Sequence, residues 1–275
     1  MNVGSDGSQL LYSTYFGGDK GEEPRMLHVD EGGDLYIAGY SGSTDLPVSS
    51  GAYRATNPGV YSGFVVKFDP STSTVEFCTY LGGSGADTVN GGFVDDNGTT
   101  YIVGYTESSD FPVTSGAFST TWTADSEAFV AAIGPEGRDL RYSTFITTTD
   151  PSMASSVVGS GDGRVCVAGI TNATDFPVTP DANKTTPPDL FDVFLAVFDG
   201  SLSRLLYCTL VGGTDDDYDP IVDIGPDGET VFLGAYSFSS DLSTSVDAFD
   251  PLARGYEDGV LGRFDLTSYR LEYMT

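Results

Sequence analysis

The sequence predicts an all-β fold, a β-propeller of four repeated units, for three reasons. First, the segment YIAGYSGSTDLPV at 36–48 returns as YIVGYTESSDFPV at 101–113 and CVAGITNATDFPV at 166–178, with a looser copy, VFLGAYSFSSDLS, at 231–243. Second, one glycine and one aspartate recur at a spacing of 65 or 66 residues, namely Gly39, Gly104, Gly169 and Gly234, and Asp45, Asp110, Asp175 and Asp241. Third, no stretch of useful length has apolar residues at helical spacing. A fixed period of this length is typical of repeat architectures.

Each repeat begins with two runs of strand character around a tight turn. In the first repeat these runs are MLHVD at 26–30 and LYIAGY at 35–40. The turns between such runs are Glu31-Gly32-Gly33, Asp96-Asn97-Gly98, Gly161-Asp162-Gly163 and Pro226-Asp227-Gly228. Asn-Gly and Asp-Gly between β-formers strongly indicate a hairpin, because glycine accepts a positive φ.

Two further runs complete the repeat. The third, GFVVKFD at 63–69, recurs at 128–134, 193–199 and 260–265, and the fourth, VEFCTYLGG at 75–83, recurs at 140–148 and 205–213. Four antiparallel strands joined by tight turns indicate propeller blades. A solenoid of hairpins is less favoured, because the runs are apolar on alternate residues, as face-to-face packing requires. We expect one domain over residues 1–275, with repeats at about 10–74, 75–139, 140–204 and 205–275.

The fourth run is matched twice more, at 9–16 and at 269–275, so the chain holds one extra terminal strand. Three arrangements accommodate it. The extra strand clasps a ring shut, or the chain is an arc of a longer array, or two chains complete a larger ring. We favour a closed ring of four blades, although four is the lower limit of the usual range of ~4–8.

Several motifs recur in a fixed order, namely YSTYFGG from Tyr12, the AGY or VGY strand end, the Asp-[Phe/Leu]-Pro-Val segment, GAY or GAF at Gly51 and Gly116, and FVVKFDP from Phe64. Together they resemble the SBBP-type β-propeller repeat of large bacterial and archaeal surface and secreted proteins. The chain departs from the pattern at Thr147-Thr148, which replaces Gly-Gly, and at Asp241-Leu242-Ser243, which lacks the proline. The resemblance implies a propeller in an extracellular or envelope-associated protein, with no shared enzymatic activity and no catalytic residues to carry over.

Charge narrows the classes of partner. Forty acidic residues against twelve lysines and arginines give a net charge of −28, which repels nucleic-acid phosphates and anionic lipids. No apolar run approaches the ~20 residues that span a bilayer, and the N-terminus shows no secretion signal. We therefore expect neither nucleic-acid binding nor membrane insertion.

The three cysteines are expected to be free. Cys78 and Cys208 lie two whole periods apart and so occupy the same place in alternate repeats, too far from each other for a disulfide. Cys166 belongs to a different strand. We interpret all three as buried thiols that act as small apolar residues.

Four long loops, at 41–62, 106–127, 171–192 and 237–258, are expected on one face of the propeller. Function concentrates where long loops are anchored by a rigid scaffold. The loop aromatics that could stack on a glycan or pack on a protein are Tyr53, Tyr61, Phe118, Trp122 and Tyr256.

Acidic residues suggest a metal site. The aspartates that recur once per repeat are expected to form Asx-turns in their own loops. Glu22, Asp87 and Asp217 share one register position, where the third repeat has Ser152, and carboxylates gathered at the mouth of a channel suit Ca²⁺. The alternative is a solvated acidic rim, which we favour.

His28 is the single histidine, and a closed ring would bring it near Asp223 as an acid–base pair. The expected function is a non-enzymatic binding module of the cell surface, with a protein or glycan partner at the long-loop face and Ca²⁺ as a candidate cofactor. A structural subunit joined through its terminal strands by β-augmentation is the second hypothesis. An acid–base polysaccharide lyase or hydrolase is the third.

Overall fold

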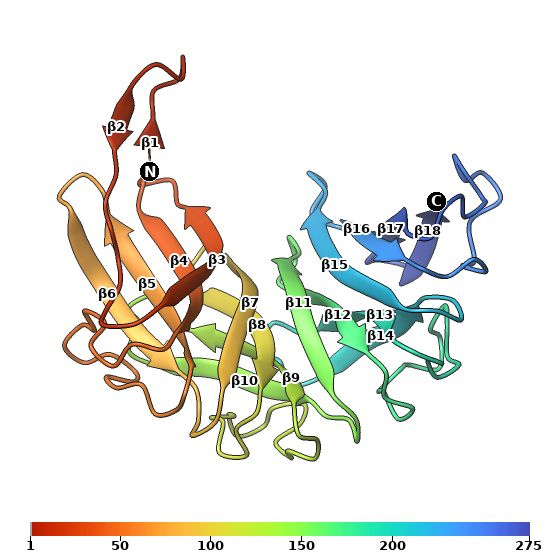
Figure 1. The fold of residues 1–275 in the computed structure, drawn as a ribbon, viewed down its shortest axis with the longest axis horizontal. Helices are drawn as coiled ribbons and strands as arrows, with labels where there is room; N and C mark the ends of the chain where they lie inside the picture. The colour runs from red at the N-terminus through yellow and green to blue at the C-terminus, as the bar shows by residue number, and fades with distance from the viewer. Residues whose placement is uncertain (1) are drawn as a thin grey trace.

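The alternating apolar runs of each repeat form the strands of one sheet. The computed structural model describes residues Asn2–Thr275, and no helix occurs among them. They form four four-stranded antiparallel sheets and a small hairpin, which confirms the all-β, four-bladed architecture (Figure 1). Within this part of the chain there is no helix long and apolar enough to cross a membrane.

The strands follow one another in chain order within every sheet. The first sheet consists of β3 (Glu22–Val29), β4 (Leu35–Ser41), β5 (Ser62–Asp69) and β6 (Thr74–Leu81). The second consists of β7 (Asp87–Val94), β8 (Thr100–Thr106), β9 (Glu127–Ile133) and β10 (Leu140–Ile146). The third consists of β11 (Ser152–Gly159), β12 (Val165–Thr171), β13 (Asp192–Phe198) and β14 (Leu205–Val211). The fourth consists of β15 (Asp217–Ile224), β16 (Thr230–Ser237), β17 (Asp258–Asp265) and β18 (Arg270–Met274).

The predicted hairpin turns join the first two strands of each sheet. Their last glycines, Gly33, Gly98, Gly163 and Gly228, have φ values of 90°, 77°, 85° and 70°. A side chain is strained at such angles, so glycine is required there. The turn prediction is confirmed in all four repeats.

Neighbouring sheets pack face to face through their apolar residues. The first strand of each later sheet packs on three strands of the preceding sheet. Strand β7 packs on β3, β4 and β5, strand β11 on β7, β8 and β9, and strand β15 on β11, β12 and β13. Each of these junctions contains its own cluster of buried side chains. The core is therefore a series of layers between sheets.

The sheets form an open arc. The first and fourth sheets stand at its two ends, and in the described part of the chain they do not pack on each other (Figure 1). The extra strand, β2 (Leu10–Tyr12), pairs with β1 (Asn2–Val3) in a projecting hairpin instead of clasping a ring. The closed ring that we favoured is thus not formed in this structure, and the arc is the alternative that describes it.

The fourth repeat contains one extra residue, which shifts its glycine out of register. Gly39, Gly104 and Gly169 pair with Phe64, Phe129 and Phe194 on the third strand, but the partner of Val260 is Ala235. The cause is a longer β15–β16 turn, closed by a bond from Gly225 to Thr230, where the third repeat closes from Ser160 to Arg164. The assignment of Gly234 as the fourth equivalent glycine was therefore wrong by one residue.

Candidate functional site

Each candidate metal ligand stands at the first position of a sheet's first strand. Glu22 pairs with Ser41, Asp87 with Thr106, and Asp217 with Ser237. Asp87 is buried and accepts hydrogen bonds from the Gly83 amide at 2.7 Å, from Ser108 Oγ at 3.1 Å and from Thr106 Oγ1. Burial raises the pKa of Asp87, and these donors only partly offset the effect.

The other two carboxylates follow the same pattern. Glu22 Oε1 accepts hydrogen bonds from the hydroxyls of Ser41 and Ser43, and Asp217 Oδ2 accepts them from the Gly213 amide and from Ser239. Glu22, Asp87 and Asp217 lie in three different sheets, and none belongs to the one cluster of three potential metal ligands found among the described residues. The structure thus does not gather them at a channel mouth, and each holds its own sheet end together.

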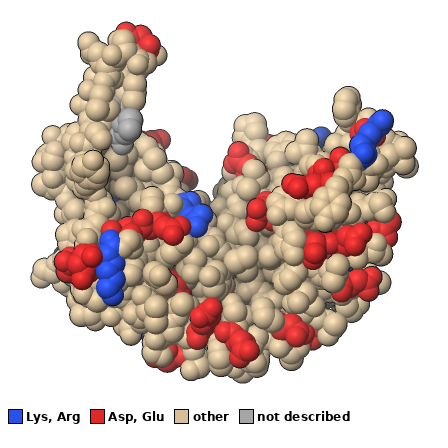
Figure 2. Space-filling model, in the orientation of Figure 1, with Lys and Arg blue, Asp and Glu red and all other residues tan. Residues whose placement is uncertain are grey.

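That one cluster already contains a cation. Asp34, Asp69 and Glu76 approach one another, and Lys67 Nζ lies 2.8 Å from Asp34 and 2.9 Å from Glu76. Burial lowers the pKa of Lys67, but the hydrogen bonds to Asp34 and Glu76 outweigh it and raise the pKa overall. Elsewhere, Figure 2 shows acidic side chains spread over the visible face with few basic ones among them.

The aspartates of the repeated segment tie the long loop of each sheet to the segment that enters the same sheet. Asp45 and Asp110 each accept a hydrogen bond at 2.7 Å, from the amides of Asp19 and Ser84, and Asp175 and Asp241 each accept one at 3.0 Å, from Thr149 and Thr214. These donors lie 26 or 27 residues earlier, in the segment that enters the sheet. The expected Asx-turn within the loop is therefore replaced by a longer-range bond, although the role remains structural.

A Gly-Gly pair precedes three of the four sheets and leaves room for two carboxylates, the one that begins the sheet and the one in its long loop. A Cβ on Gly82 would lie 2.5 Å from Asp87 Oδ2, and one on Gly83 would lie 2.5 Å from Asp110 Oδ1. In the third copy Thr147 and Thr148 replace the glycines, and the adjoining carboxylate is replaced by Ser152. The shorter serine frees the space that the Thr147 side chain needs, because Thr147 is the equivalent of Gly82, where a Cβ would meet the carboxylate of Asp87.

Three of the five candidate loop aromatics pack inward. Tyr53 and Trp122 lie against the core between the first and second sheets, and Phe118 contacts Phe198 with ring centroids 5.7 Å apart. Tyr61 and Tyr256 point outward: Tyr61 packs on Tyr40, and Tyr256, 86% exposed, packs on Phe238. The exposed pair alone is placed to meet a ligand.

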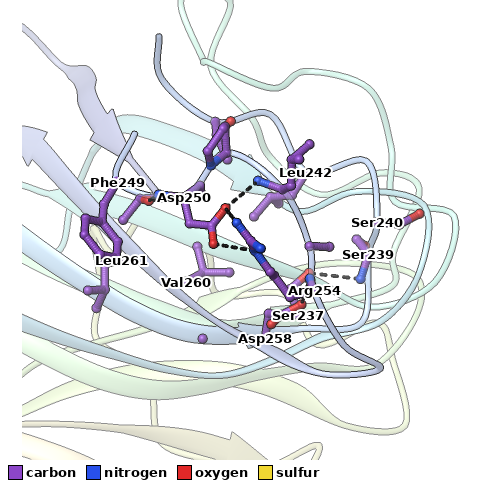
Figure 3. Close-up of a pocket in the computed structure, with 16 residues that line it drawn as sticks. Ser237, Ser239, Ser240, Leu242, Phe249, Asp250, Arg254, Asp258, Val260 and Leu261 are labelled. Atoms are coloured by element: carbon purple, nitrogen blue, oxygen red, sulfur yellow. Dashed lines mark hydrogen bonds and ion pairs between the residues drawn. The ribbon is translucent and has the colours of Figure 1, made fainter. Parts of the chain in front are cut away.

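A pocket opens beneath the long loop of the fourth sheet (Figure 3). Val260 stands there in the register position that Phe64, Phe129 and Phe194 occupy in the other sheets. Arg254 crosses the pocket and pairs with Asp250 at 2.7 Å. The pocket is thus the space that a phenylalanine ring fills elsewhere.

The remaining candidates are separated or inert. His28 packs edge-on against Tyr36 in the first sheet, whereas Asp223 lies in the fourth, so they form no acid–base pair. Cys78, Cys166 and Cys208 are free and buried, as expected. Burial raises the pKa of Cys78 and of Cys166 to about 12.

The sequence reasoning missed the two end faces of the arc. On the first sheet Leu27 is 68% exposed, although its register equivalent Val157 is 4% exposed between the second and third sheets. On the fourth sheet Leu261 is 63% exposed, while its equivalent Leu195 is 1% exposed. The sequence gives no signal for these surfaces, because Leu27 and Leu261 are apolar like their buried equivalents in the other repeats.

Comparisons with known proteins add little to this picture. No family model matches the chain. The regulatory protein FlaEY of Caulobacter vibrioides is 41% identical over 87 residues, which make up 31% of this chain and only 9% of that protein. The SBBP-type repeat therefore stays a prediction.

Solved structures give only distant matches. A protein of unknown function from Dyadobacter fermentans aligns over 94% of this chain and 64% of its own, with a TM-score of 0.48 and 13% identity. The quinohemoprotein alcohol dehydrogenase of Comamonas testosteroni aligns over 90% and 45%, with a TM-score of 0.40 and 11% identity, and BamB of Moraxella catarrhalis over 77% and 58%, with 0.29 and 13%. TM-scores below 0.5 do not establish a shared fold, so the fold assignment rests on the four sheets themselves.

Proposed function

We propose that this protein is a non-enzymatic interaction module that associates head to tail, with the end face of its fourth sheet on the first sheet of a second copy. The observation that carries the proposal is the exposure of side chains whose equivalents are buried at the internal junctions. The contact is face to face, and so differs from the terminal-strand pairing that the sequence suggested.

The first face is mainly apolar, although Arg25 and Tyr12 also line its hollow. Pro24, Leu27, Val29, Leu35 and Ile37 line one hollow on it. Ile37 is the register equivalent of Ile102 and Val167, both fully buried beneath the preceding sheet. A sheet laid on this face would therefore repeat a junction that the molecule already forms three times.

The fourth face offers the complementary surface. Ile221, Phe232 and Leu261 are exposed there, and Phe232 is the equivalent of Cys166, which is buried by the fourth sheet. Burying one leucine or phenylalanine side chain contributes about 1.5–3 kcal/mol. Such a contact joins two different surfaces, so it propagates unless the assembly closes into a ring.

Two variants test this arrangement without disturbing the core. Leu27→Asp spoils the first face, Leu261→Asp spoils the fourth, and both side chains are largely exposed. Sedimentation equilibrium should show a wild-type mass that rises with concentration and a monomer of 29.0 kDa for each variant alone. An equimolar mixture should give a dimer and nothing larger, because it retains one intact pair of faces. A monomeric wild type, or a mixture that stays monomeric, would overturn the proposal.

A second candidate function is ligand binding at the long-loop face. It is favoured by the exposed Tyr256 and by the half-buried Phe238 and Tyr236 beside it, where Phe238 contacts both tyrosines edge-on. Aromatic faces of this kind stack on sugar rings. A glycan screen against wild type and Tyr256→Ala tests it, and binding unaffected by that change would exclude this surface.

An acid–base enzyme is not favoured, because His28 and Asp223 lie on different sheets, and because buried Asp87 is engaged by backbone and hydroxyl donors. An extracellular or envelope location fits the acidic composition, with only three lysines in the chain. Immunolabelling of intact cells tests that location.

A further inference from the structure

The junction between the third and fourth sheets holds two buried carboxylates side by side. Asp192 begins β13 and Asp217 begins β15, and they are 1% and 2% exposed. A Cβ on Gly212, in the segment between the two sheets, would overlap Asp192 Oδ1 and lie 2.6 Å from Asp217 Oδ2. The two carboxylates therefore converge on one point.

Two of their four oxygens lack a hydrogen-bond donor. Asp192 Oδ1 and Asp217 Oδ1 accept no hydrogen bond, and the partner of Asp192 Oδ2 is the Lys184 ammonium. Buried polar atoms are normally satisfied, because an unpartnered one destabilises the folded state and an unpartnered charge does so more strongly. The junction thus holds two buried carboxylates whose hydrogen-bonding capacity is not filled by the protein.

A cationic side chain lies against this group. Lys184 Nζ is 2.7 Å from Asp192 Oδ2, 3.0 Å from the carbonyl oxygen of Gly212 and 3.3 Å from that of Gly213. One ammonium leaves one of the two negative charges uncompensated. The Lys184 side chain is 23% exposed, so it has a route to solvent.

The other junctions lack this arrangement. The first pairs Ser62 with Asp87, and the second pairs Glu127 with Ser152, so each contains a single carboxylate. The positions equivalent to Lys184 hold Arg54 and Ser119, whose amides make the same bond to a strand threonine. A feature present in one repeat is not needed to build a blade.

We propose that Asp192, Asp217 and the carbonyls of Gly212 and Gly213 form a divalent-cation site, in which Ca²⁺ and the Lys184 ammonium compete. Carboxylate and carbonyl oxygens in an irregular arrangement are the ligands that Ca²⁺ accepts, with water completing its shell of 6–8. Calcium neutralises both carboxylates and sends Lys184 into solvent. The site differs from the Glu22, Asp87 and Asp217 set, since it shares only Asp217.

The test is calcium titration by calorimetry, with melting curves in Ca²⁺ and in chelator at constant ionic strength. Lys184→Met removes the competing ammonium and should bind Ca²⁺ at least about tenfold more tightly than wild type, with a larger rise in Tm. Lys184→Gln provides a second neutral variant should the methionine protein fail to fold. Asp192→Asn should abolish the Ca²⁺-dependent shift.

The matched control is Asp189→Asn, which removes the same charge from an exposed carboxylate three residues away. It should bind Ca²⁺ as wild type does. The proposal is overturned if neither Lys184 variant binds Ca²⁺ more tightly than wild type, or if Asp192→Asn retains the shift. It is also overturned if Asp189→Asn loses the shift to the same extent, because Ca²⁺ would then be responding to net charge alone.

Discussion

Gly104 and Gly234 differ in the space around them, although the sequence places them at equivalent positions. A Cβ on Gly104 would overlap the carbonyl oxygen of Thr88 and lie 2.8 Å from its carbon and 3.1 Å from Val89 Cα. All three are backbone atoms of β7, so no rotamer change relieves the overlap. A Cβ on Gly234 would meet only the side chain of Ile221, at 3.3 Å or more.

We expect Gly104→Ala to destabilise the protein by about 3–5 kcal/mol. Carbon atoms in contact prefer ~3.5–4.0 Å, so β7 must move away by several tenths of an ångström or more. That combines overpacking, at about 1–3 kcal/mol, with weakened buried backbone hydrogen bonds, at about 1–3 kcal/mol each. Gly234→Ala should change stability by less than about 1 kcal/mol, and in the stabilising direction, because alanine suits a strand better than glycine.

Urea unfolding followed by far-ultraviolet circular dichroism measures both variants. At ~2–4 °C per kcal/mol, Gly104→Ala should also lower Tm by roughly 10 °C. Equal losses in the two variants would refute the shifted register of the fourth sheet. A silent Gly104→Ala would refute the close approach of β8 to β7.

Three further predictions concern the sheet junctions and the core. Val260→Phe should raise stability by about 1 kcal/mol, because the other sheets bury a phenylalanine there; a loss in Tm would show that the pocket in Figure 3 is not the space of that ring. Asp110→Ala should cost about 1–2 kcal/mol, since it removes two hydrogen bonds from Ser84. The hydrogen bonds from Ser84, first the one from its backbone amide, lower the pKa of Asp110 from 3.8. The stabilisation by Asp110 is therefore present at neutral pH and is lost as the pH falls through this lowered pKa. The melting temperatures of wild type and variant should converge in acid. Finally, an aromatic disulfide reagent should label no cysteine of the native protein and all three in denaturant, and rapid native labelling of Cys78 or Cys166 would contradict their burial.

The strands and turns were predictable because their signals are local. Gly33 and its counterparts mark turns through a positive φ that only glycine accepts readily, and that requirement is independent of neighbouring sheets. The one-residue register shift of the fourth repeat was not predictable, because a second glycine hides it. The extra residue lies in the β15–β16 turn, and a glycine, Gly234, happens to stand 65 residues after Gly169.

Which faces are covered was not predictable. Leu27 and Leu261 belong to strands whose apolar residues look like those of any buried blade. Periodicity reports that a face is apolar and says nothing about what packs on it. The closed ring was an inference from strand number, and strand number does not fix the angle between successive sheets.

The acidic residues show the same limit at the level of single side chains. Register correctly placed Glu22, Asp87 and Asp217 at one position, yet that position is the start of a strand in three separate sheets. Asp192 was overlooked because its equivalents vary, from Ser62 to Glu127 and Asp258, and nothing in the sequence places it beside Asp217. Its importance arises only when β13 and β15 are brought together beneath Lys184.

Repetition itself separates the two roles of a carboxylate in this protein. A carboxylate that recurs with its donors, as Asp110 does with the Ser84 amide and Asp241 with that of Thr214, has its partners supplied by the same repeat. Asp192 has no backbone or hydroxyl donor and depends on a lysine that no other repeat provides at this position. Because a buried charge without fixed partners costs several kcal/mol, such a pair persists only where a cation, whether an ammonium or a metal ion, compensates it. Asp192 therefore lies where a blade junction can respond to the cations around it. Asp110 and Asp241, whose donors belong to the repeat, lie where it cannot.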